Sequence, residues 1–247
     1  MTGITRIYAL TKRNVKEILR EPINLVFLYG LPAAMLVLFY LLFHSATSQF
    51  EMKYLAPAMI CFGQSFISLF AGILVSTDRA SSFMGRLYAT RTTSAEFILG
   101  YTLAMIPTAL SQTFIFLLTA VIIDPSVLSP YLALALVFGI FTALFFIGAG
   151  LLFGSLCNEK SVGGVTTVVT IGQSVLSGMW FPTEGLSGTF LKIMDVLPFK
   201  NGSLLMQNVA AGSFSFDGVC RPLIVITAYA VVAFFAAVLV FRKKMTR

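Results

Sequence analysis

The side chains of this chain that could do chemistry are few and scattered. There is one histidine, His44, and there are three cysteines, Cys61, Cys157 and Cys220, with no C-x-x-C pair. An odd number of distant cysteines predicts neither a disulfide framework nor a zinc site. The sequence also lacks the phosphate-cradling G-x-x-x-x-G-K-[ST] loop and the H-E-x-x-H and G-x-S-x-G motifs of hydrolytic sites. We therefore expect no enzyme and no bound cofactor or metal; if ATP drives the protein, another subunit binds it.

The densest group of charged and apolar side chains lies in residues 78–96, STDRASSFMGRLYATRTTSAEF with its flanks. We expect a short helix from Asp78 to Ala89. Apolar residues at helical spacing among charges favour a surface that docks on another protein; packing beneath the rest of the chain is the alternative. Thr93 and Glu96 form a capping box that opens the next helix. The candidate docking residues are Asp78, Arg79, Phe83, Arg86, Leu87 and Tyr88.

The elements that must position these residues are membrane helices. The 247 residues are 57% hydrophobic and 11% charged, whereas a soluble domain carries roughly 25% charged residues. This composition predicts an all-α integral membrane protein. A run of about 20 apolar residues is long enough to cross a bilayer as a helix. We expect one transmembrane domain, 1–247, with six spans. Their predicted bounds are 23–44, 54–77, 97–123, 131–157, 162–181 and 220–241.

The net charge of +7 is explained by the loops rather than by nucleic-acid binding. Positive residues collect on the cytoplasmic side of membrane proteins. One set of segments carries Arg6, Lys12, Arg13, Lys16, Arg20, Arg79, Arg86, Arg91, Lys160, Arg242, Lys243, Lys244 and Arg247. The opposite set carries Lys53, Lys192, Lys200 and Arg221. Both termini should therefore be cytoplasmic, with an even number of crossings.

Residues 4–21 are not a span. Ile4, Ile7, Tyr8, Thr11, Val15 and Ile18 share one helical face, and the face opposite carries Arg6, Arg13, Lys16, Glu17 and Arg20. Such a basic amphipathic helix lies in the membrane interface. It is either a simple positive anchor or a helix that also docks a cytoplasmic partner through residues such as Arg13 and Glu17.

The polar groups inside the predicted spans are neutral. A proton- or sodium-coupled carrier usually needs buried carboxylates or histidines near the bilayer centre. Their absence argues against a self-driven carrier and against a charge-selective channel. Gly150 and Gly154 form a G-x-x-x-G pair that allows close helix packing, within one chain or between two.

Two stretches resemble permease subunits of type-2 ATP-binding-cassette exporters. In 78–112 the matching residues are Asp78, Arg79, Arg86, Thr93, Glu96, Leu99, Gly100 and Gln112. In 151–210 they are Ser177, Gly178, Phe181, Pro182, Glu184, Leu186, Leu197 and Pro198.

The resemblance implies a half-transporter. Two copies would pair, as a homodimer or with a paralogue, and dock on two copies of a separate ATPase subunit that holds ATP and Mg. Docking would use the N-terminal helix and the 78–96 loop. The translocation path would be lined by the first, second and fifth spans, through Phe39, Tyr40, Gln64, Ser68, Gln173 and Ser177.

The stretch LSGMWFPTEG should end the fifth span, because Pro182 lacks an N–H and Trp180 suits an interface. We expect residues 187–209 to re-enter the outer leaflet as two short helices broken at Pro198. An outer gate would then comprise Trp180, Phe181, Pro182, Glu184, Leu186 and Pro198.

The expected function is ATP-driven export of a hydrophobic or amphipathic drug, antibiotic or antimicrobial peptide across a bacterial cytoplasmic membrane. Export of a lipid-linked polysaccharide or teichoic-acid-type glycan is the alternative within the family. A non-transporting assembly or anchor protein is the alternative of another class.

Overall fold

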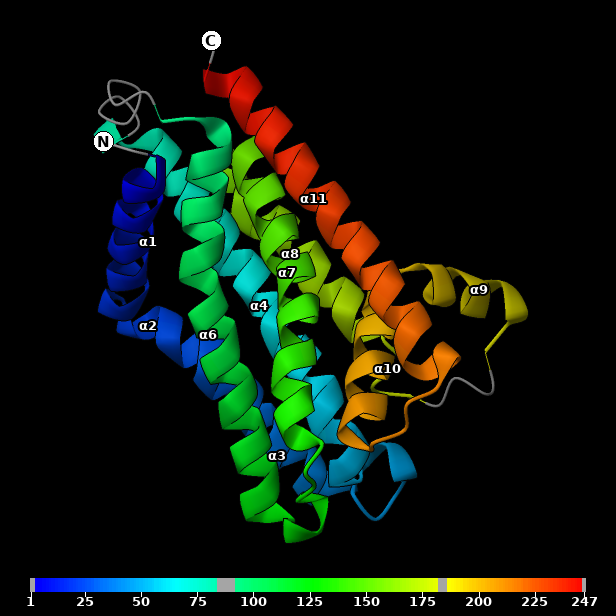
Figure 1. The fold of residues 1–247 in the computed structure, drawn as a ribbon. Coiled ribbons are helices and arrows are strands. Elements are labelled where there is room, and N and C mark those ends of the chain that lie inside the picture. Colours follow the sequence, from blue (N-terminus) through cyan, green and yellow to red (C-terminus); the bar gives the residue numbers. More distant parts are fainter. Residues whose placement is uncertain (1–2, 84–91, 182–185, 246–247) are drawn as a thin grey trace.

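The structure is a computed structural model that describes residues 3–83, 92–181 and 186–245, and its regular elements there are all helices (Figure 1). The prediction of an all-helical protein is confirmed. The α-helices are α1 (Gly3–Arg20), α2 (Pro22–Leu25), α3 (Leu31–Phe43), α4 (Met52–Ala80), α6 (Ser94–Ile123), α7 (Leu132–Leu156), α8 (Glu159–Leu176), α9 (Gly188–Val196), α10 (Pro198–Ala210) and α11 (Arg221–Met245). Short 3-10 or π turns are η1 (Val26–Gly30), η2 (Ser48–Phe50), η3 (Pro125–Val127) and η5 (Phe216–Cys220).

Five of the described segments are long and apolar enough to cross a membrane. They are Val26–Phe43, Met52–Ala80, Ser94–Ile123, Leu132–Leu156 and Phe216–Lys244. The predicted span 162–181 corresponds to α8, which is 18 residues long and includes Glu159, Lys160 and several threonines. Because α8 is not among the five, several membrane spans are confirmed but the predicted number of six is not.

Helix α4 is the centre of the bundle and packs against α6, α7, α8 and α10. Two glycines of α7 permit its close approach to α4. A Cβ at Gly150 would lie 2.3 Å from the Ser68 carbonyl oxygen, and one at Gly154 would lie 2.6 Å from the Gly72 carbonyl oxygen. The G-x-x-x-G pair therefore serves packing within one chain.

A π turn, η1, interrupts the first span just before Pro32. Pro32 has no N–H with which to bond the carbonyl four residues earlier, which belongs to Leu28. The side-chain amide of Gln112, on α6, donates to that carbonyl at 2.5 Å. The Tyr29 hydroxyl lies 2.8 Å from Ser111 Oγ, so two side-chain contacts hold the π turn against α6.

Helix α8 ends at Leu176, five residues before the predicted end of the span at 181. Gly178 has a φ of 72°, the left-handed conformation in which glycine ends helices. The helix therefore stops before Pro182 is reached. Beyond it, α9 and α10 meet at Leu197 and Pro198, and Pro198 occupies the first turn of α10. The predicted break at Pro198 is observed; re-entry into the membrane remains a proposal.

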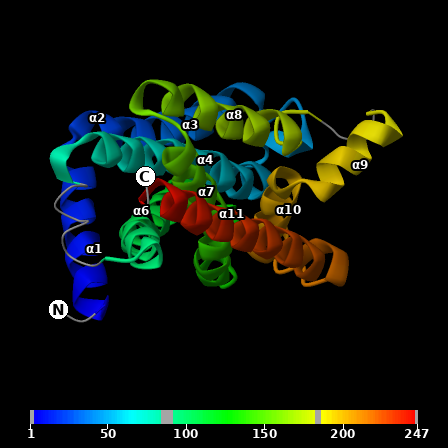
Figure 2. The ribbon, with the colours of Figure 1, turned by 90° about the horizontal axis from the view of Figure 1, so that it is seen from above.

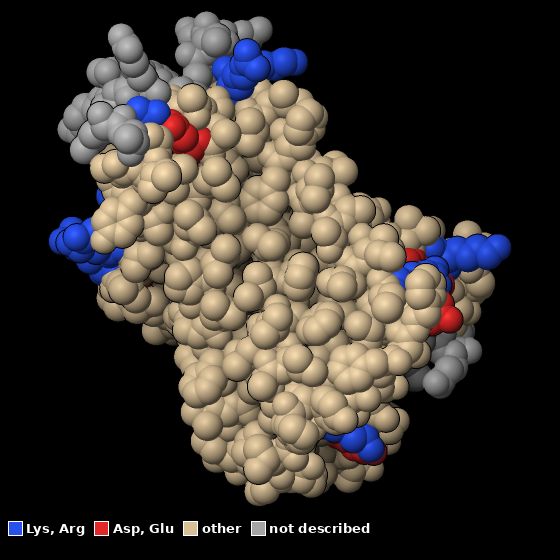
Figure 3. All heavy atoms as spheres, viewed as in Figure 1, with Lys and Arg blue, Asp and Glu red and all other residues tan. Residues whose placement is uncertain are grey.

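Charge is distributed unevenly over the molecule. Figure 3 shows one face almost free of charged residues across its middle. Positive residues gather where α1, the end of α4 and the end of α11 lie, and α11 finishes with Arg242, Lys243 and Lys244. We call this the basic end of the bundle; the opposite end carries η2, η3 and the turn after α6.

Candidate functional site

Helix α1 docks along the outside of the basic end. Figure 1 shows it beside α6, and in Figure 2, the view from above, it is seen along its length while α6 and α7 are seen nearly end-on, so α1 is tilted against them. Leu10 is buried against Gly100 of α6, where an added Cβ would lie 2.7 Å from the Leu10 Cβ. The Thr11 hydroxyl also contacts the Gly100 carbonyl oxygen at 3.2 Å. Gly100 thus lets α1 approach the backbone of α6.

The face that α1 turns to the bundle is rotated from the predicted apolar face: Thr11 and Ile18 of that face still contact the bundle. Ile4 and Tyr8 are 81% and 65% exposed, whereas Arg6 and Arg13 turn toward α6 and α4. The sequence places both arginines opposite the apolar residues, and the rotation of α1 brings them to the bundle. The cause is two carboxylates, Glu96 and Asp78, which attract the arginines across the packing face.

Arg13 and Asp78 form the core of this site. The guanidinium of Arg13 contacts both carboxylate oxygens of Asp78, with Nη2 to Oδ1 at 2.7 Å. Asp78 is only 3% exposed, and the buried Tyr101 hydroxyl donates to it from α6. A buried carboxylate needs such partners, since an unpaired buried charge is costly. The cluster joins α1, α4 and α6.

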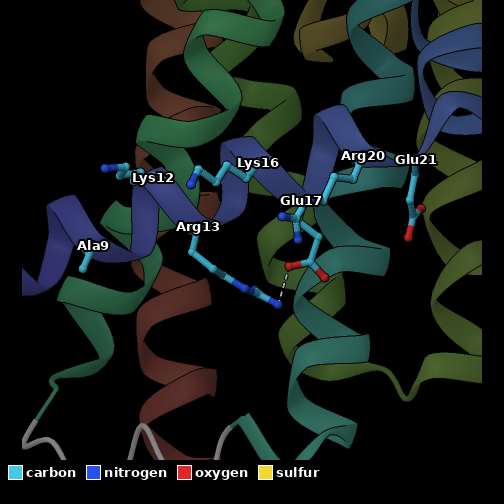
Figure 4. Close-up of a pocket in the computed structure, with 7 residues that line it drawn as sticks. All are labelled: Ala9, Lys12, Arg13, Lys16, Glu17, Arg20 and Glu21. Atoms are coloured by element: carbon cyan, nitrogen blue, oxygen red, sulfur yellow. Dashed lines mark ion pairs between the residues drawn. The ribbon is translucent and has the colours of Figure 1, made fainter.

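Two further side chains complete the cluster around Arg13. Glu17 forms an ion pair with Arg13 one helical turn along α1, as the dashed line in Figure 4 marks. The Arg13 guanidinium carbon lies 4.6 Å from the ring centroid of Phe83, a cation–π distance. Arg13, Glu17, Asp78 and Phe83 are therefore brought together as one site.

The predicted short helix from Asp78 to Ala89 is corrected only at its start, because residues 84–91 lie outside the described part of the chain. Asp78 and Arg79 lie in the last turn of α4, which continues to Ala80. Arg79 donates to the carbonyl oxygens of Gly154 at 2.7 Å and Cys157 at 3.0 Å. These carbonyls belong to the end of α7, whose last turns have no intrahelical donors. Arg79 therefore binds α4 to α7 within the chain.

A second ion pair fixes the first half of α1. The Arg6 guanidinium contacts Glu96 at 2.6 Å and 3.1 Å. Glu96 also accepts from the Thr93 backbone N–H at 2.9 Å, while the Thr93 hydroxyl caps the Glu96 N–H at 3.3 Å. The predicted capping box is thus confirmed, and its glutamate serves α1 as well.

The ion pairs and the burial of α1 shift the pKa values of Arg6, Arg13 and Glu17. The hydrogen bond from Arg6 to Glu96 raises the Arg6 pKa, and this effect exceeds the lowering by burial. For Arg13, burial lowers the pKa, but the hydrogen bond and charge of Asp78 more than offset this, so the net shift is upward. Burial raises the Glu17 pKa, and the attraction of Arg13 only partly opposes that rise.

The side of α1 that faces away from the bundle is rich in exposed cations. Lys12, Lys16 and Arg20 follow each other at four-residue intervals and are exposed. With Ala9, Arg13, Glu17 and Glu21 they line an open cavity of about 610 Å³ (Figure 4). Exposed Leu19 lies among these cations. A face that mixes cations with apolar residues suits the headgroup layer of a bilayer.

The predicted path residues lie in two places. Gln64 is buried among α4, α6 and α7: its amide nitrogen donates to Gly139 O at 3.0 Å, and its amide oxygen accepts from the Thr142 hydroxyl at 2.7 Å. Ser68 is buried beside Gly150. Gln173, on α8, donates to Ser203 of α10 at 3.1 Å. Their assignment to a path therefore stays a prediction.

The predicted gate residues partly converge at the end of α8. The rings of Trp180 and Phe39 are 4.4 Å apart, and the Trp180 indole donates to Ser174 at 2.7 Å. Gln49 of η2 donates to the Phe181 carbonyl at 2.9 Å. Ser177 is buried there, whereas the ring of Tyr40 stacks on His44. Leu186 precedes α9 and Pro198 opens α10.

Five predicted site residues lie outside the described residues: Arg86, Leu87, Tyr88, Pro182 and Glu184.

Sequence reasoning missed Arg6 and Tyr101 as members of the site. Arg6 sits seven residues before Arg13, two helical turns away, and that spacing places both on one face. Nothing local marked Tyr101, because its partner Asp78 is 23 residues away in the chain.

The fold and the charge distribution define a multi-pass helical membrane protein whose N-terminal helix is tied to its bundle. The family model for the ABC-2 type transporter matches residues 5–209, so this chain belongs to the ABC-2 type transporter family. The resemblance to permease subunits of this family, predicted from the sequence, is confirmed. The family supplies the membrane permease component of the transporter, which is not itself the ATPase. No curated protein matches the chain.

Proposed function

We propose that the chain is the permease subunit of an ATP-driven exporter, and that the cluster around Arg13 couples it to a separate ATPase subunit. The observation that carries this is the pair of ionic contacts, Arg13 to Asp78 and Arg6 to Glu96. They bind α1 to the last turn of α4 and the first turn of α6. A partner that pushes on α1 or on the segment between α4 and α6 would therefore move two spans directly.

The neighbouring contacts extend this connection into the bundle. Arg79 adjoins Asp78 and holds the end of α7, while Lys244 of α11 donates to the Leu156 carbonyl at 2.6 Å. A displacement of the end of α4 would thus also move α7 and α11. Rigid elements joined by hydrogen bonds are the means by which a local push becomes a change elsewhere.

The assembly that we propose has two copies of the permease, preferably identical, and two copies of the ATPase subunit with ATP and Mg. The basic end would face the cytoplasm of a bacterium, because positive residues collect on that side. Both termini would then be cytoplasmic. The end of α8, with Trp180 and Phe181, and the α9–α10 pair would form an outer gate.

The proposed substrate is a hydrophobic or amphipathic molecule such as a drug, antibiotic or antimicrobial peptide. Exposed apolar residues on α8, Val168, Ile171 and Val175 among them, support a path or pairing surface without charge. A lipid-linked glycan is the second candidate within the family.

The coupling assignment is tested with the double variant Arg13→Gln/Asp78→Asn, which removes the pair without leaving a lone buried charge. We expect the complex with the ATPase to assemble but to lose most of the stimulation of ATP hydrolysis by substrate. Lys53→Gln, at the opposite end, is the matched control, since its pair with Glu51 is exposed. Full stimulation in the double variant would disprove the assignment.

The path assignment has a separate test. Gln173→Ala and Ser68→Ala should each lower transport or the resistance that it confers, while ATP hydrolysis continues. If both variants transport normally, the path does not run past these residues.

A further inference from the structure

A groove opens on the flank of the bundle between the junction of α1 and α2 and the last turns of α4. We call it the lateral groove. Its free volume is about 70 Å³. It is lined by Glu17, Ile18, Glu21, Asn24, Leu28, Phe70, Ile73, Leu74, Thr77 and Met105.

The bottom of the groove is apolar, and one end of it is acidic. Leu28 and Met105 form a buried floor, at 2% and 1% exposed. Ile73, at 37% exposed, stands at the rim. The only charged residues among its lining are Glu17 and Glu21. A ligand that fills the groove would place an apolar part on the floor and a polar part against the carboxylates.

Of the two carboxylates that line the groove, Glu17 is paired with Arg13. Arg13 is shared between Glu17 and the buried Asp78, so one cation faces two carboxylates. Glu21 accepts from the Asn24 amide, and no ion pair of Glu21 occurs among the described residues. Lys12, Lys16 and Arg20 line the outer cavity of Figure 4 together with Glu17 and Glu21, but they do not line the lateral groove. The charged side chains that line the groove are thus both acidic, in a chain whose net charge is +7.

The groove lies at the ends of two candidate spans, where we expect hydrocarbon to give way to headgroups. The first candidate span begins at Val26, between the lining residues Asn24 and Leu28. Ile73, Leu74 and Thr77 belong to the last two turns of α4, another candidate span. We therefore expect the exposed Ile73 to lie toward the bilayer interior, and Glu17 and Glu21 to lie at its polar boundary. A molecule that partitions into one leaflet would reach the groove sideways.

We propose that the lateral groove is the access site through which the permease takes up cationic amphiphiles, molecules with an alkyl or aromatic body and an ammonium or guanidinium headgroup. This rests on the proposed export function and narrows its substrate class. Charge complementarity decides the class: an anionic lipid-linked glycan would place like charges against Glu17 and Glu21. The small free volume means that the groove holds one end of a larger substrate.

Binding can be measured on the purified full-length chain in detergent, without the ATPase. The probe is a fluorescent alkyl trimethylammonium, and its control is the tert-butyl isostere, which has the same shape and no charge. We expect Glu21→Gln to weaken binding of the cation several-fold and Glu17→Gln/Glu21→Gln about tenfold, with binding of the neutral isostere unchanged. Ile73→Trp, which fills the rim, should weaken both probes.

Glu51→Gln is the matched control, since Glu51 lies at the opposite end beside Lys53, and thermal unfolding confirms that each variant is folded. Equal binding of the cation by wild type and the double variant would overturn the proposal. Competition by phosphatidylethanolamine at bilayer mole fractions would make the groove a lipid site and would overturn it as well.

Experiments can contradict the export function and the access site independently of each other. If Glu17 and Glu21 govern binding but vesicles with the ATPase show no ATP-driven transport, the export function is wrong and the site stands. If cations are exported with an unchanged KM by the double variant, the function stands and the access site is wrong.

Discussion

The side-chain amide of Gln112 donates to the carbonyl of Leu28 at 2.5 Å, at the position where Pro32 has no N–H to offer. The glutamine thus compensates for the proline across two helices. A buried carbonyl without a donor costs free energy comparable to a lost hydrogen bond. The π turn of the first span is therefore a feature that α6 stabilises.

Gln112→Leu should lower the free energy of unfolding by about 1–3 kcal/mol, the usual cost of leaving a buried polar group without its partner. Pro32→Ala restores a backbone N–H, so the same substitution should cost less in that background. SDS titration followed by the fluorescence of Trp180, the chain's only tryptophan, measures both. Identical costs in the two backgrounds would show that Gln112 does not replace the missing N–H.

The Arg13 pair makes a second prediction, about stability. Arg13→Gln leaves Asp78 buried with a hydroxyl as its partner and should destabilise the chain by on the order of 3 kcal/mol. Arg13→Gln/Asp78→Asn should cost clearly less than the sum of the two single changes, because it removes the buried charge. The same unfolding titration gives the double-mutant cycle. Strict additivity would mean that the two residues do not act together.

Several local features were predictable from the sequence because their signals are local. The two residues of the capping box, Thr93 and Glu96, are three positions apart, and the break at Pro198 depends on one proline ring. The existence of α1 follows from its periodicity. In each case the interacting atoms lie within one or two turns of the same helix, so the pattern of residue types is sufficient.

The contacts of the site were not predictable in the same way. Arg13 and Asp78 are 65 residues apart, and the rotation of α1 depends on where α4 and α6 place their carboxylates. A helical wheel shows which residues share a face, but not which face meets the bundle. The end of α8 was misjudged for a related reason: Gly178 adopts a positive φ before Pro182 is reached.

The α4–α7 contact allows a comparison between two glycines. Gly150→Ala should destabilise the chain by about 1–3 kcal/mol, because overpacking displaces a backbone and not a flexible side chain; the Ser68 carbonyl lies in the way. At Gly164 nothing lies within 4 Å of an added Cβ. Gly164→Ala should therefore stabilise α8 by up to about 1 kcal/mol through helix propensity. Equal effects in thermal unfolding would contradict the close packing of α4 and α7.

Glu17 gives the stability of the chain a defined dependence on pH. Burial raises its pKa in the folded state above the ordinary value of 4.5, so folding favours the protonated form. Its contribution is complete below the unfolded pKa and is lost as the pH rises through the folded pKa. The stability of wild type relative to Glu17→Gln should therefore fall as the pH rises from about 4. An unfolding series across that range would refute the prediction if the difference stayed constant or rose.

The same group gives cation binding in the lateral groove the opposite dependence on pH. Only ionised Glu17 attracts a cation, so affinity should be highest above its folded pKa and decline as the pH falls through it. Arg13, Asp78 and Glu21 are the charged groups that act on Glu17, and Arg13 stays positive throughout. Because the Glu17 pKa is raised, the decline should begin at a higher pH than for an exposed glutamate. A trimethylammonium probe keeps its charge at every pH, so fluorescence titrations report the protein alone. Glu17→Gln should remove the part of the decline that begins at the raised pKa of Glu17; an unchanged profile would exclude Glu17 from the site.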